Sequence, residues 1–326
     1  MKIAAIAFTD QGLSLGGRLK SGLQGHAVTL TDGREKRLKD WTEESFRQCG
    51  GLVFIGAAGI AVRAIAPLVR AKWEDPAVVV VDELGRFAIP ILSGHIGGAN
   101  RLAGEIAQTI GATPVITTAT DSNGVFAIDQ WAVSQGMAVG NPQFIKKISG
   151  RLLRGESITI FGAYSWKGTL PESVRTGSQD GDVYLGPLVC RDRLHLIPRS
   201  CVLGIGCRRG VTLEKLEAAL DQVAERVDVR AIGRISTIAL KAKEPGLLQL
   251  AEKHGWPVSI YSAEELEQVP GEFTASEFVR RVAGVDNVCE RSAVLCAGGP
   301  LVLGKLARDG VTMAVAESPK EVSFEQ

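Results

Sequence analysis

The feature that most constrains the fold is an alternation of short apolar runs with amphipathic segments in the first 120 residues and again after residue 200. The apolar runs have the length of buried strands, and the segments between them have helical periodicity. This rhythm predicts an α/β fold with mostly parallel sheets and helices on both faces. In the first half we expect strands at 2–8, 27–32, 51–57, 77–83, 86–92 and 114–120, and helices at 14–23, 40–49, 58–70 and 98–111.

Three local signals refine this first half. Pro67 should interrupt the third helix, because proline lacks the backbone N–H of a helix interior. Leu84 and Gly85 between two apolar runs predict a hairpin turn. A further helix is expected to start near Asp121 or Ser122 and to run to about residue 136.

Composition along the chain predicts three parts: an amino-terminal α/β domain at 1–139, a small loop-rich middle region at 140–199, and a second α/β domain at 200–326. In the last part Thr212 is a plausible N-cap, Ser262 and Glu265 form a capping box, and Gly255 ends a helix. Its strands are expected at 201–207, 229–241, 257–262, 301–307 and 311–318, and its helices at 211–226, 246–255, 263–269 and 276–284.

The charge balance argues against a polyanionic partner. The chain has 37 basic and 36 acidic side chains and a formal net charge of +1, so neither nucleic acid nor an anionic membrane surface is expected to bind it. No apolar stretch has the length of a membrane span, and the first residues resemble a buried strand more than a secretory signal. We therefore expect a soluble, cytoplasmic protein.

The cysteines and histidines do not indicate a metal centre. The six cysteines are scattered without a C-x-x-C pair, and the four histidines lack ligand-like spacing. We expect free thiols and no metal bound by protein side chains. Cys207 and Cys289 have no evident histidine partner, which makes a thiolate nucleophile a weak candidate.

Glycines are abundant, 38 of 326 residues, and many follow directly after apolar runs. Loops at the carboxyl ends of parallel strands line the ligand crevice, where glycine lets backbone N–H groups approach an anion. Ordinary tight turns explain any one cluster equally well, but three clusters together favour a shared anionic ligand. The clusters are Gly56 and Gly59; Gly94, Gly97 and Gly98; and Gly204, Gly206 and Gly210.

The segment Ser93-Gly94-His95-Ile96-Gly97-Gly98-Ala99-Asn100 has the strongest chemical character. A histidine between glycines, after a strand and before a helix, can exchange a proton near neutral pH. It can equally cap the helix or orient a ligand, and both alternatives stay open. Downstream, Thr118, Thr120 and Asp121 could bind a polar ligand, although capping is the simpler role for Asp121.

Arg208 and Arg209 precede a predicted helix, where their charge opposes the helix dipole. They could clamp carboxylates, for which the guanidinium fork is suited, or they could be a solvated pair. Lys241, Glu244 and Glu290 are further ionisable groups near expected loop ends. The glycine spacing around Arg208 departs from the dinucleotide fingerprint, which argues against nicotinamide binding.

Long segments of the chain resemble the CbiG family of cobalamin biosynthesis proteins. The block from Val53 through SGHIGGAN to residue 132 resembles the family's amino-terminal region. GIGCRRGVTLEKL, STIALKAKE, GVDNVCERSAVL and GVTMAVAES resemble its carboxy-terminal domain, in the same order. The resemblance covers nearly the whole chain and is weakest at 141–199. Ala239 stands where the family often has an acidic residue, which speaks against an acid role at that strand.

The resemblance implies a hydrolase of the anaerobic route to vitamin B12. Its substrate would be cobalt-precorrin-5A, a cobalt corrinoid rich in carboxylates, whose ring A δ-lactone opens to give cobalt-precorrin-5B and acetaldehyde. Cobalt would arrive with the substrate, so no cofactor is expected, and a homodimer stays open. The alternatives are a non-catalytic tetrapyrrole carrier and a nucleotide- or sugar-phosphate-binding enzyme.

The residues assigned to this function come from the patterns and the resemblance together. His95 is expected to be the catalytic base, with backbone N–H groups near Gly97 and Gly98 as oxyanion donors. The substrate-binding residues are expected to be Gly56, Gly59, Arg63, Ser93, Gly94, Gly97, Gly98, Asn100, Thr118, Thr120, Asp121, Gly206, Cys207, Arg208, Arg209, Lys241, Glu244 and Glu290.

Overall fold

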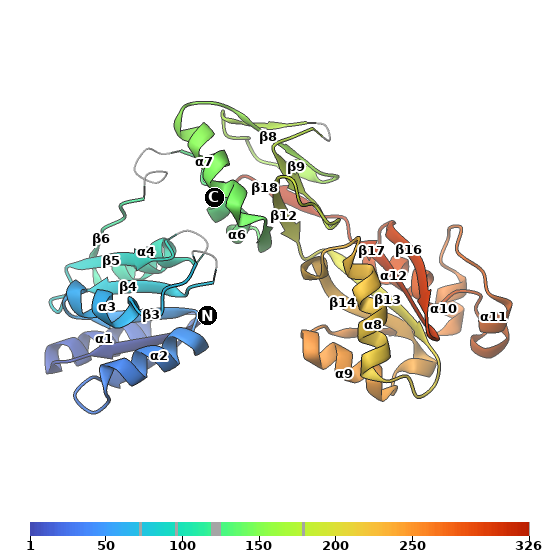
Figure 1. Cartoon of the computed structure of the whole chain (residues 1–326), viewed down its shortest axis with the longest axis horizontal. Coiled ribbons are helices and arrows are strands. Elements are labelled where there is room, and N and C mark those ends of the chain that lie inside the picture. Colours follow the sequence, from blue (N-terminus) through green and yellow to red (C-terminus); the bar gives the residue numbers. More distant parts are fainter. Residues whose placement is uncertain (72–73, 95–96, 119–124, 178–179, 326) are drawn as a thin grey trace. The chain divides into compact units, whose positions relative to one another are not determined.

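A computed structural model describes residues 1–71, 74–94, 97–118, 125–177 and 180–325. Backbone contacts divide the chain into two compact units, Met1–Gln130 and Trp131–Gln326, and each is described by itself. The predicted α/β class with mostly parallel sheets is confirmed (Figure 1). The three-part division into 1–139, 140–199 and 200–326 stays a prediction. Within the described residues, no helix has the length and apolarity needed to cross a membrane.

The first unit is built on a six-stranded sheet covered by helices on both faces. Side chains alternate along β1: Ile3 and Ala5 pack toward α1 and α4, whereas Ala4 and Ile6 pack toward α2 and α3. In sheet order the strands are β2 (Ala27–Asp32), β1 (Lys2–Ala7), β3 (Gly51–Ile55), β4 (Ala77–Val81), β5 (Phe87–Leu92) and β6 (Thr113–Pro114). The helices are α1 (Asp10–Gly22), α2 (Leu38–Gln48), α3 (Ala58–Ile65) and α4 (Ala99–Ile110).

Two strands at one side of this sheet, β5 and β6, run opposite to the other four. β1, β2, β3 and β4 are parallel, but β5 pairs antiparallel with β4 through the predicted turn at Leu84 and Gly85. In the register, Leu92 at the end of β5 lies beside Val78 at the start of β4. The chain therefore leaves β5 at the edge of the sheet opposite to the edge where it leaves β3.

Two predictions in this unit were wrong. The strand expected at 114–120 is reduced to β6, which pairs with β5 at only two positions. Val115 still donates to the carbonyl of Ala88, but the next rung would need an N–H from Pro90, which proline lacks. The helix expected from Asp121 or Ser122 to about residue 136 is not continuous, because residues 125–127 are not helical and α6 covers only Ile128–Ser134. Asp121 and Ser122 themselves lie outside the described residues.

The first part of the second unit forms a small sheet with a short amino-terminal strand at its edge. β7 pairs antiparallel with β12, and the other neighbours are parallel. In sheet order the strands are β10 (Val174–Thr176), β8 (Ile158–Phe161), β11 (Val183–Leu185), β12 (Leu194–Pro198) and β7 (Met137–Gly140). The helices in this stretch are α6 (Ile128–Ser134), the 3-10 turn η1 (Pro142–Phe144) and α7 (Ile145–Leu153).

The end of the chain returns to this small sheet. β18 (Glu321–Ser323) pairs in parallel with β9 (Ser165–Lys167). The indole Nε1 of Trp131 donates to the carbonyl of Ser323 at 2.9 Å, and its ring stacks on Phe324 with ring centroids 4.6 Å apart. The carboxy-terminal residues are thus held by the region that precedes the last α/β sheet in sequence.

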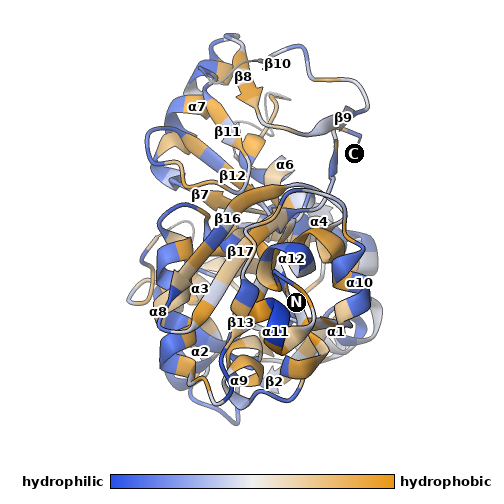
Figure 2. Ribbon diagram, turned by 90° about the vertical axis from the view of Figure 1, so that its right-hand side faces the viewer, coloured by the Kyte–Doolittle hydropathy of each residue, from blue (hydrophilic) through white to orange (hydrophobic). Residues whose placement is uncertain are grey.

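The rest of the second unit is an α/β sheet with α8 and α9 on one face and α12 on the other. The helices carry both polar and apolar segments, as expected when one face of each is buried (Figure 2). In sheet order the strands are β15 (Val258–Tyr261), β14 (Ile232–Ile238), β13 (Cys201–Cys207), β17 (Val311–Glu317) and β16 (Leu301–Arg308). The helices and 3-10 turns are α8 (Leu213–Ala224), η2 (Val229–Ala231), η3 (Ala239–Lys241), α9 (Pro245–His254), α10 (Ala263–Glu267), α11 (Glu277–Ala283) and α12 (Cys289–Ala297).

Several helix boundaries in this unit follow the predicted signals. Ser262 and Glu265 form both hydrogen bonds of a capping box at α10. Gly255 ends α9 in the left-handed conformation with φ of 63°. Thr212 is the N-cap of α8 by position, although its side chain accepts no capping hydrogen bond. Helix α12 was not predicted, because its sequence has little amphipathic periodicity and is buried on most sides.

A single glycine allows α12 to lie close to the sheet. A Cβ atom at Gly204 in β13 would stand only 1.8 Å from the carbonyl oxygen of Cys289. Any side chain at this position would push the start of α12 away from β13. Glu290 and Arg291, which follow Cys289, would move with it.

We therefore expect Gly204→Ala to lower the stability of the second unit by about 3 kcal/mol or more, since overpacking against backbone has no flexible partner to move. In scanning calorimetry its melting temperature should fall by about 6 °C or more. Gly304→Ala is the matched control, because a Cβ there would make only an ordinary 3.5 Å contact with Glu290. Equal melting temperatures for both variants would contradict the close approach of α12.

Candidate functional site

A cavity of about 640 Å³ opens at the carboxyl ends of β13 and β14. Gly206 and Cys207 end β13, and Ile238 ends β14. Because β17 is antiparallel to β13, the turn between β16 and β17 reaches the same edge and brings Gly310 to the cavity. Helix α11 supplies a further wall through Phe278.

Five of the residues predicted for substrate binding meet in this cavity. Gly206, Cys207, Arg208, Arg209 and Lys241 all line it. They come from two segments separated by about thirty residues, which the parallel pairing of β13 with β14 brings side by side.

Close packing holds the Arg208 loop against the β16–β17 turn. The backbone N–H of Arg208 donates to the carbonyl of Gly310 at 3.0 Å. A Cβ at Gly310 would stand 2.8 Å from the Cδ of Arg208, and the φ of Gly310 is 82°. Glycine is therefore required at this turn both for its backbone conformation and for the space that Arg208 occupies.

Glu244 lies behind the cavity and positions residues that line it. Its buried carboxylate accepts hydrogen bonds from the backbone N–H of Gly210 and from the Nζ of Lys241, the latter at 3.2 Å. Burial alone would raise the pKa of Glu244, but these two hydrogen bonds outweigh it and hold the pKa below its usual value. Glu244 is therefore an anion that orders the Arg208–Gly210 loop, and it does not line the cavity.

Sequence reasoning missed two cations of the site. Lys305 and Arg308 on β16 line the cavity together with Arg208, Arg209 and Lys241. Their signal is the Asp309-Gly310 pair, a typical hairpin turn, which puts the end of β16 at the edge reached by β13.

The lining has a strong excess of positive charge. Asp309 is the carboxylate among the lining residues, against five basic side chains. Lys241 is paired with Glu244, and Arg308 donates to the carbonyl of Ala218 at 3.0 Å. Among the residues that the structure describes, the side chains of Arg208, Arg209 and Lys305 have no hydrogen-bond or ion-pair partner. The cavity thus presents charge that an anionic ligand can neutralise.

Apolar side chains face these cations. Leu240, Phe278 and Val282 line the cavity, yet 65%, 60% and 62% of their surfaces are exposed. Ile238 and Val288 add a buried apolar floor. Exposed large apolar side chains that converge on one hollow are typical of a ligand-binding surface.

The two thiols at this cavity are protonated at neutral pH. Burial raises the pKa of Cys207 to about 11, although the charge of Lys241 opposes the shift. Burial likewise raises the pKa of Cys289 to about 11. Neither sulfur is therefore a thiolate at neutral pH, which agrees with the lack of an evident histidine partner for either cysteine in the sequence. All six cysteines are free, and the described residues contain no cluster of side chains suited to a metal ion.

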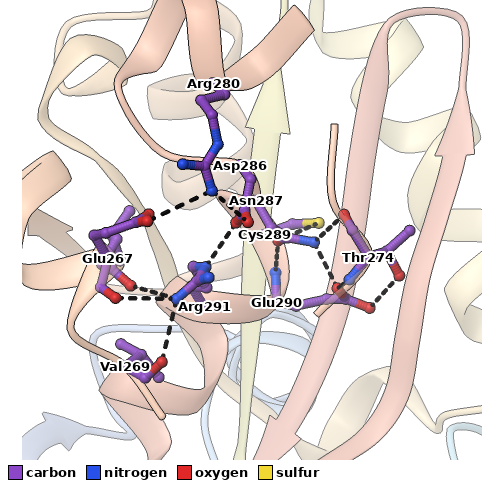
Figure 3. Close-up of polar contacts among 10 residues, drawn as sticks. Glu267, Val269, Thr274, Arg280, Asp286, Asn287, Cys289, Glu290 and Arg291 are labelled. Carbon is purple, nitrogen blue, oxygen red and sulfur yellow. Dashed lines mark hydrogen bonds and ion pairs between the residues drawn. The ribbon is translucent and has the colours of Figure 1, made fainter. Parts of the chain in front are cut away.

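Glu290 is buried beneath the cavity and does not line it. It lies in the first turn of α12, and its carboxylate accepts hydrogen bonds from backbone and side-chain donors of the same unit (Figure 3). Glu290 was expected near a loop end and in contact with the substrate; it follows a loop, but at the start of a helix that was not foreseen, and it is not among the residues that line the cavity. Its carboxylate is already hydrogen-bonded to residues of the same unit.

In the first unit, the segment around Ser93 forms a tight turn between β5 and α4. Ser93 has a φ of 56°, and its Oγ is buried without a hydrogen-bond partner among the described residues. A Cβ at Gly97 would stand 2.3 Å from the Cβ of Ser93, and one at Gly94 would stand 2.7 Å from the Oδ1 of Asn100. Gly98 is the N-cap of α4 with φ of 83°. These glycines are required by close packing and backbone conformation.

The segment that follows β6 meets this turn. The buried Asn100 donates from Nδ2 to the Oγ1 of Thr118 at 3.0 Å. Ser93, Gly94, Gly97, Gly98, Asn100 and Thr118 therefore lie together, as predicted. His95, Thr120 and Asp121 lie outside the described residues.

We expected the glycine clusters of the first unit to lie at one edge of the sheet, but they lie at opposite edges. Gly56 follows β3 and Gly59 begins α3, at the edge where β3 ends, and Arg63 is exposed on α3. The Ser93 turn follows β5, which runs in the opposite direction, and therefore lies at the other edge. That expectation was wrong because it did not take into account the reversal of β5 that the predicted hairpin at Leu84 and Gly85 implies. Gly59 also has open space around its Cα, so no close contact requires glycine there.

Comparison with known proteins adds an independent line of evidence. Residues 40–121 match the family model "Cobalamin synthesis G N-terminal", and residues 201–316 match "Cobalamin synthesis G C-terminus". A cobalt-precorrin-5A hydrolase from Salmonella typhimurium is 34% identical, covering 96% of this chain and 97% of that protein. One from Priestia megaterium is 30% identical, covering 92% and 86%. The solved structure of CobE, from the cobalamin (vitamin B12) biosynthetic pathway, is 30% identical over 36% of this chain and 89% of that chain, with a TM-score of 0.32.

The backbone of Ser93 generates a prediction about stability. Ser93→Gly should stabilise the turn by about 1 kcal/mol, because glycine adopts positive φ without steric cost and no hydrogen bond of Oγ is lost. Amides of α4 should then exchange with solvent more slowly by mass spectrometry.

Ser93→Ala is the control, because it removes the hydroxyl but keeps the strained backbone. Exchange in Ser93→Ala that slows as much as in Ser93→Gly would contradict a contribution from backbone strain at this position.

Proposed function

The chain belongs to the CbiG family of cobalamin-synthesis proteins, and we propose that it is a cobalt-precorrin-5A hydrolase. The relatives that carry this name match it over nearly their whole length. The proposed reaction opens the ring A δ-lactone of cobalt-precorrin-5A with water and releases acetaldehyde, leaving cobalt-precorrin-5B.

One observation supports the substrate class most directly: the cavity of the second unit combines unpaired cations with an exposed apolar wall. A cobalt corrinoid is a flat ring with acetate and propionate carboxylates around its periphery. Arg208, Arg209 and Lys305 can bind carboxylates, while the apolar wall accepts the ring. An overall charge of +1 leaves this local excess as the source of anion recognition.

The lactone chemistry has separate requirements. Water attacks the lactone carbonyl, the ring C–O bond breaks, and the freed alkoxide collapses to acetaldehyde as its bond to the macrocycle breaks. The electron pair of that bond stays on the macrocycle, which takes up a proton. A base must accept the proton of water, and hydrogen-bond donors must stabilise the tetrahedral oxyanion.

We assign these roles to the Ser93 turn. The N–H groups of Gly97 and Gly98 precede α4, and in the described part of the chain no acceptor takes a hydrogen bond from either. Donors at a helix amino terminus suit a developing oxyanion. His95, which lies between them and Ser93 in the sequence, is proposed as the base, and Asn100 as a residue that orients the substrate.

We further propose that cobalt enters with the substrate and that the protein carries no cofactor of its own. A cytoplasmic location is supported by the six free cysteines, which suit a reducing compartment. The homodimer, and the absence of nucleic-acid and membrane partners, stay predictions.

The experiment that tests the function is direct. The purified protein is mixed with cobalt-precorrin-5A, and the acetaldehyde released is measured with a coupled dehydrogenase. The mass of the corrinoid product is measured by mass spectrometry. We expect one acetaldehyde per corrinoid consumed. Tight binding of the corrinoid without acetaldehyde would instead support a carrier.

His95→Ala should reduce kcat for acetaldehyde release by about 100-fold or more, since general-base catalysis commonly contributes that much. His26→Ala is a suitable control in the same unit, because the imidazole of His26 is already paired with Glu105 at 2.8 Å. A His95→Ala enzyme that works at nearly the rate of the unchanged protein would remove His95 from the mechanism.

Arg208→Ala should raise KM for cobalt-precorrin-5A about tenfold with little change in kcat, because it removes one carboxylate contact that takes no part in bond breaking. Steady-state kinetics of acetaldehyde release measure both constants. Lys215→Ala removes one exposed charge from α8 outside the cavity and should leave KM unchanged. An equal rise in KM for both variants would indicate a general charge effect, contrary to a specific contact.

A further inference from the structure

Helix α11 packs only partly on the core. Its Val279 and Ala283 are partly buried against a small apolar cluster, but none of its seven residues is fully buried. Two large apolar side chains, Phe278 and Val282, are exposed; they are four residues apart and therefore lie on one face of the helix. Both line the cavity. The apolar face formed by Phe278 and Val282 is thus presented to the cavity.

The segment that carries α11 is held at one end by Arg291 of α12 (Figure 3). The Nη1 of this buried guanidinium donates to the carbonyls of Leu266, Glu267 and Val269, at 3.1, 3.3 and 3.1 Å. Its Nε donates to Asp286, directly after the helix, at 3.0 Å. One side chain therefore ties the backbone before α11 to the carboxylate of Asp286 after it.

Asp286 in turn reaches α11 itself. Arg280 on the helix donates to its Oδ2 at 3.0 Å. Burial would raise the pKa of Asp286, but the hydrogen bonds from Arg291 and Arg280 hold it below the usual range. Asp286 is ionised at neutral pH and links the buried Arg291 to the helix.

Glu290 holds the same segment on the other side. Its carboxylate accepts from the backbone N–H of Thr274 at 2.7 Å, and from the backbone N–H of Lys305 at 2.8 Å. Thr274 leads into α11, and Lys305 belongs to β16 and lines the cavity. One buried carboxylate therefore joins the segment before α11 to β16. The side chain of Asn287 adds a hydrogen bond to Glu290 and another to the carbonyl of Thr274.

Burying two charged groups is costly unless hydrogen bonds replace their water. Glu290 and Arg291 are only 3% and 9% exposed, and most of their partners belong to the segment 266–287 or to β16. These buried charges fix a helix that packs on the core only through the partly buried Val279 and Ala283. The hydrogen bonds of Glu290 and Arg291 therefore fix the position of the apolar face of α11.

We propose that the apolar face of α11 packs against the flat face of the corrinoid macrocycle, and that Glu290 and Arg291 are positioning residues for it. This inference rests on the proposed function and deepens it. The occupant is set by charge as well as shape: unpaired cations at Arg208, Arg209 and Lys305 lie around the same cavity. A flat ring with a carboxylate periphery satisfies both. Glu290, predicted to contact the substrate, acts here through Thr274 and Lys305.

The apolar contact is tested with Phe278→Ala/Val282→Ala. Both side chains are exposed, so the fold does not depend on them. Cobyrinic acid, a corrin with free carboxylates and no lactone, is the probe in calorimetric titration. We expect its Kd to rise at least tenfold, because two apolar contacts are lost. KM for cobalt-precorrin-5A should rise in parallel while kcat changes little.

Leu248→Ala is the matched control. Leu248 is an exposed apolar residue on α9 outside the cavity, and its removal should leave Kd unchanged. An unchanged Kd in Phe278→Ala/Val282→Ala would overturn the proposal. If sedimentation then showed that the double variant had lost a dimer, the face of α11 would be an interface between copies of the chain.

The positioning role is tested by a double-mutant cycle. Arg291→Lys keeps the charge but loses the guanidinium fork that spans three carbonyls and Asp286. Alone it should raise Kd for cobyrinic acid about fivefold and speed hydrogen exchange at residues 273–284. In the Phe278→Ala/Val282→Ala background it should add less than twofold, because the face that it positions is already gone. Additive effects would show that Arg291 acts by a route other than α11.

Acetaldehyde release by the unchanged protein separates this inference from the proposed function. Release together with an unaltered Kd in the α11 variant defeats the inference alone. Binding that depends on Phe278 and Val282, without any acetaldehyde, defeats the hydrolase assignment alone.

Discussion

The close approach of α12 to β13 at Gly204 underlies the geometry of the whole cavity. Since the carbonyl oxygen of Cys289 occupies the place of a side chain, the first turn of α12 is locked against the sheet. The next two residues are then directed from a fixed point: Glu290 reaches Thr274 and Lys305, and Arg291 reaches the segment on either side of α11. The backbone contact at Gly204 therefore fixes the position of two charged side chains, and these in turn fix the position of an exposed helix.

The cavity shows how a nearly neutral chain can recognise a polyanion. Carboxylates that would cancel the basic side chains are kept behind the lining: Glu244 holds the loop of Gly210, and Glu290 holds β16 and the segment before α11. Their charge is directed toward backbone N–H groups, while Arg208, Arg209 and Lys305 face the hollow. Anion binding therefore depends on the local separation of these carboxylates from the basic side chains, and not on the net charge of the chain.

In the first unit, the reversal of β5 decides which residues can act together. It brings Ser93, Gly97 and Asn100 to the edge where Thr118 follows β6, and it leaves Gly56 and Arg63 at the other edge. Strain at Ser93 and glycines packed against it make this a turn whose backbone is unusually constrained. Constraint of that kind is common where a site must hold hydrogen-bond donors in place.

The sequence by itself determined the α/β class, most strands and helices, the capping box at Ser262 and the family, because these depend on local periodicity, turn chemistry and long runs of motif. It also contained the hairpin at Gly85, whose consequence for the Ser93 turn emerges only when strand directions are compared across the sheet. Tertiary structure alone decided that Lys305 and Arg308 join Arg208, that α12 is a helix, and that Glu290 is buried. Those outcomes depend on contacts between residues tens to a hundred positions apart, to which no local pattern is sensitive.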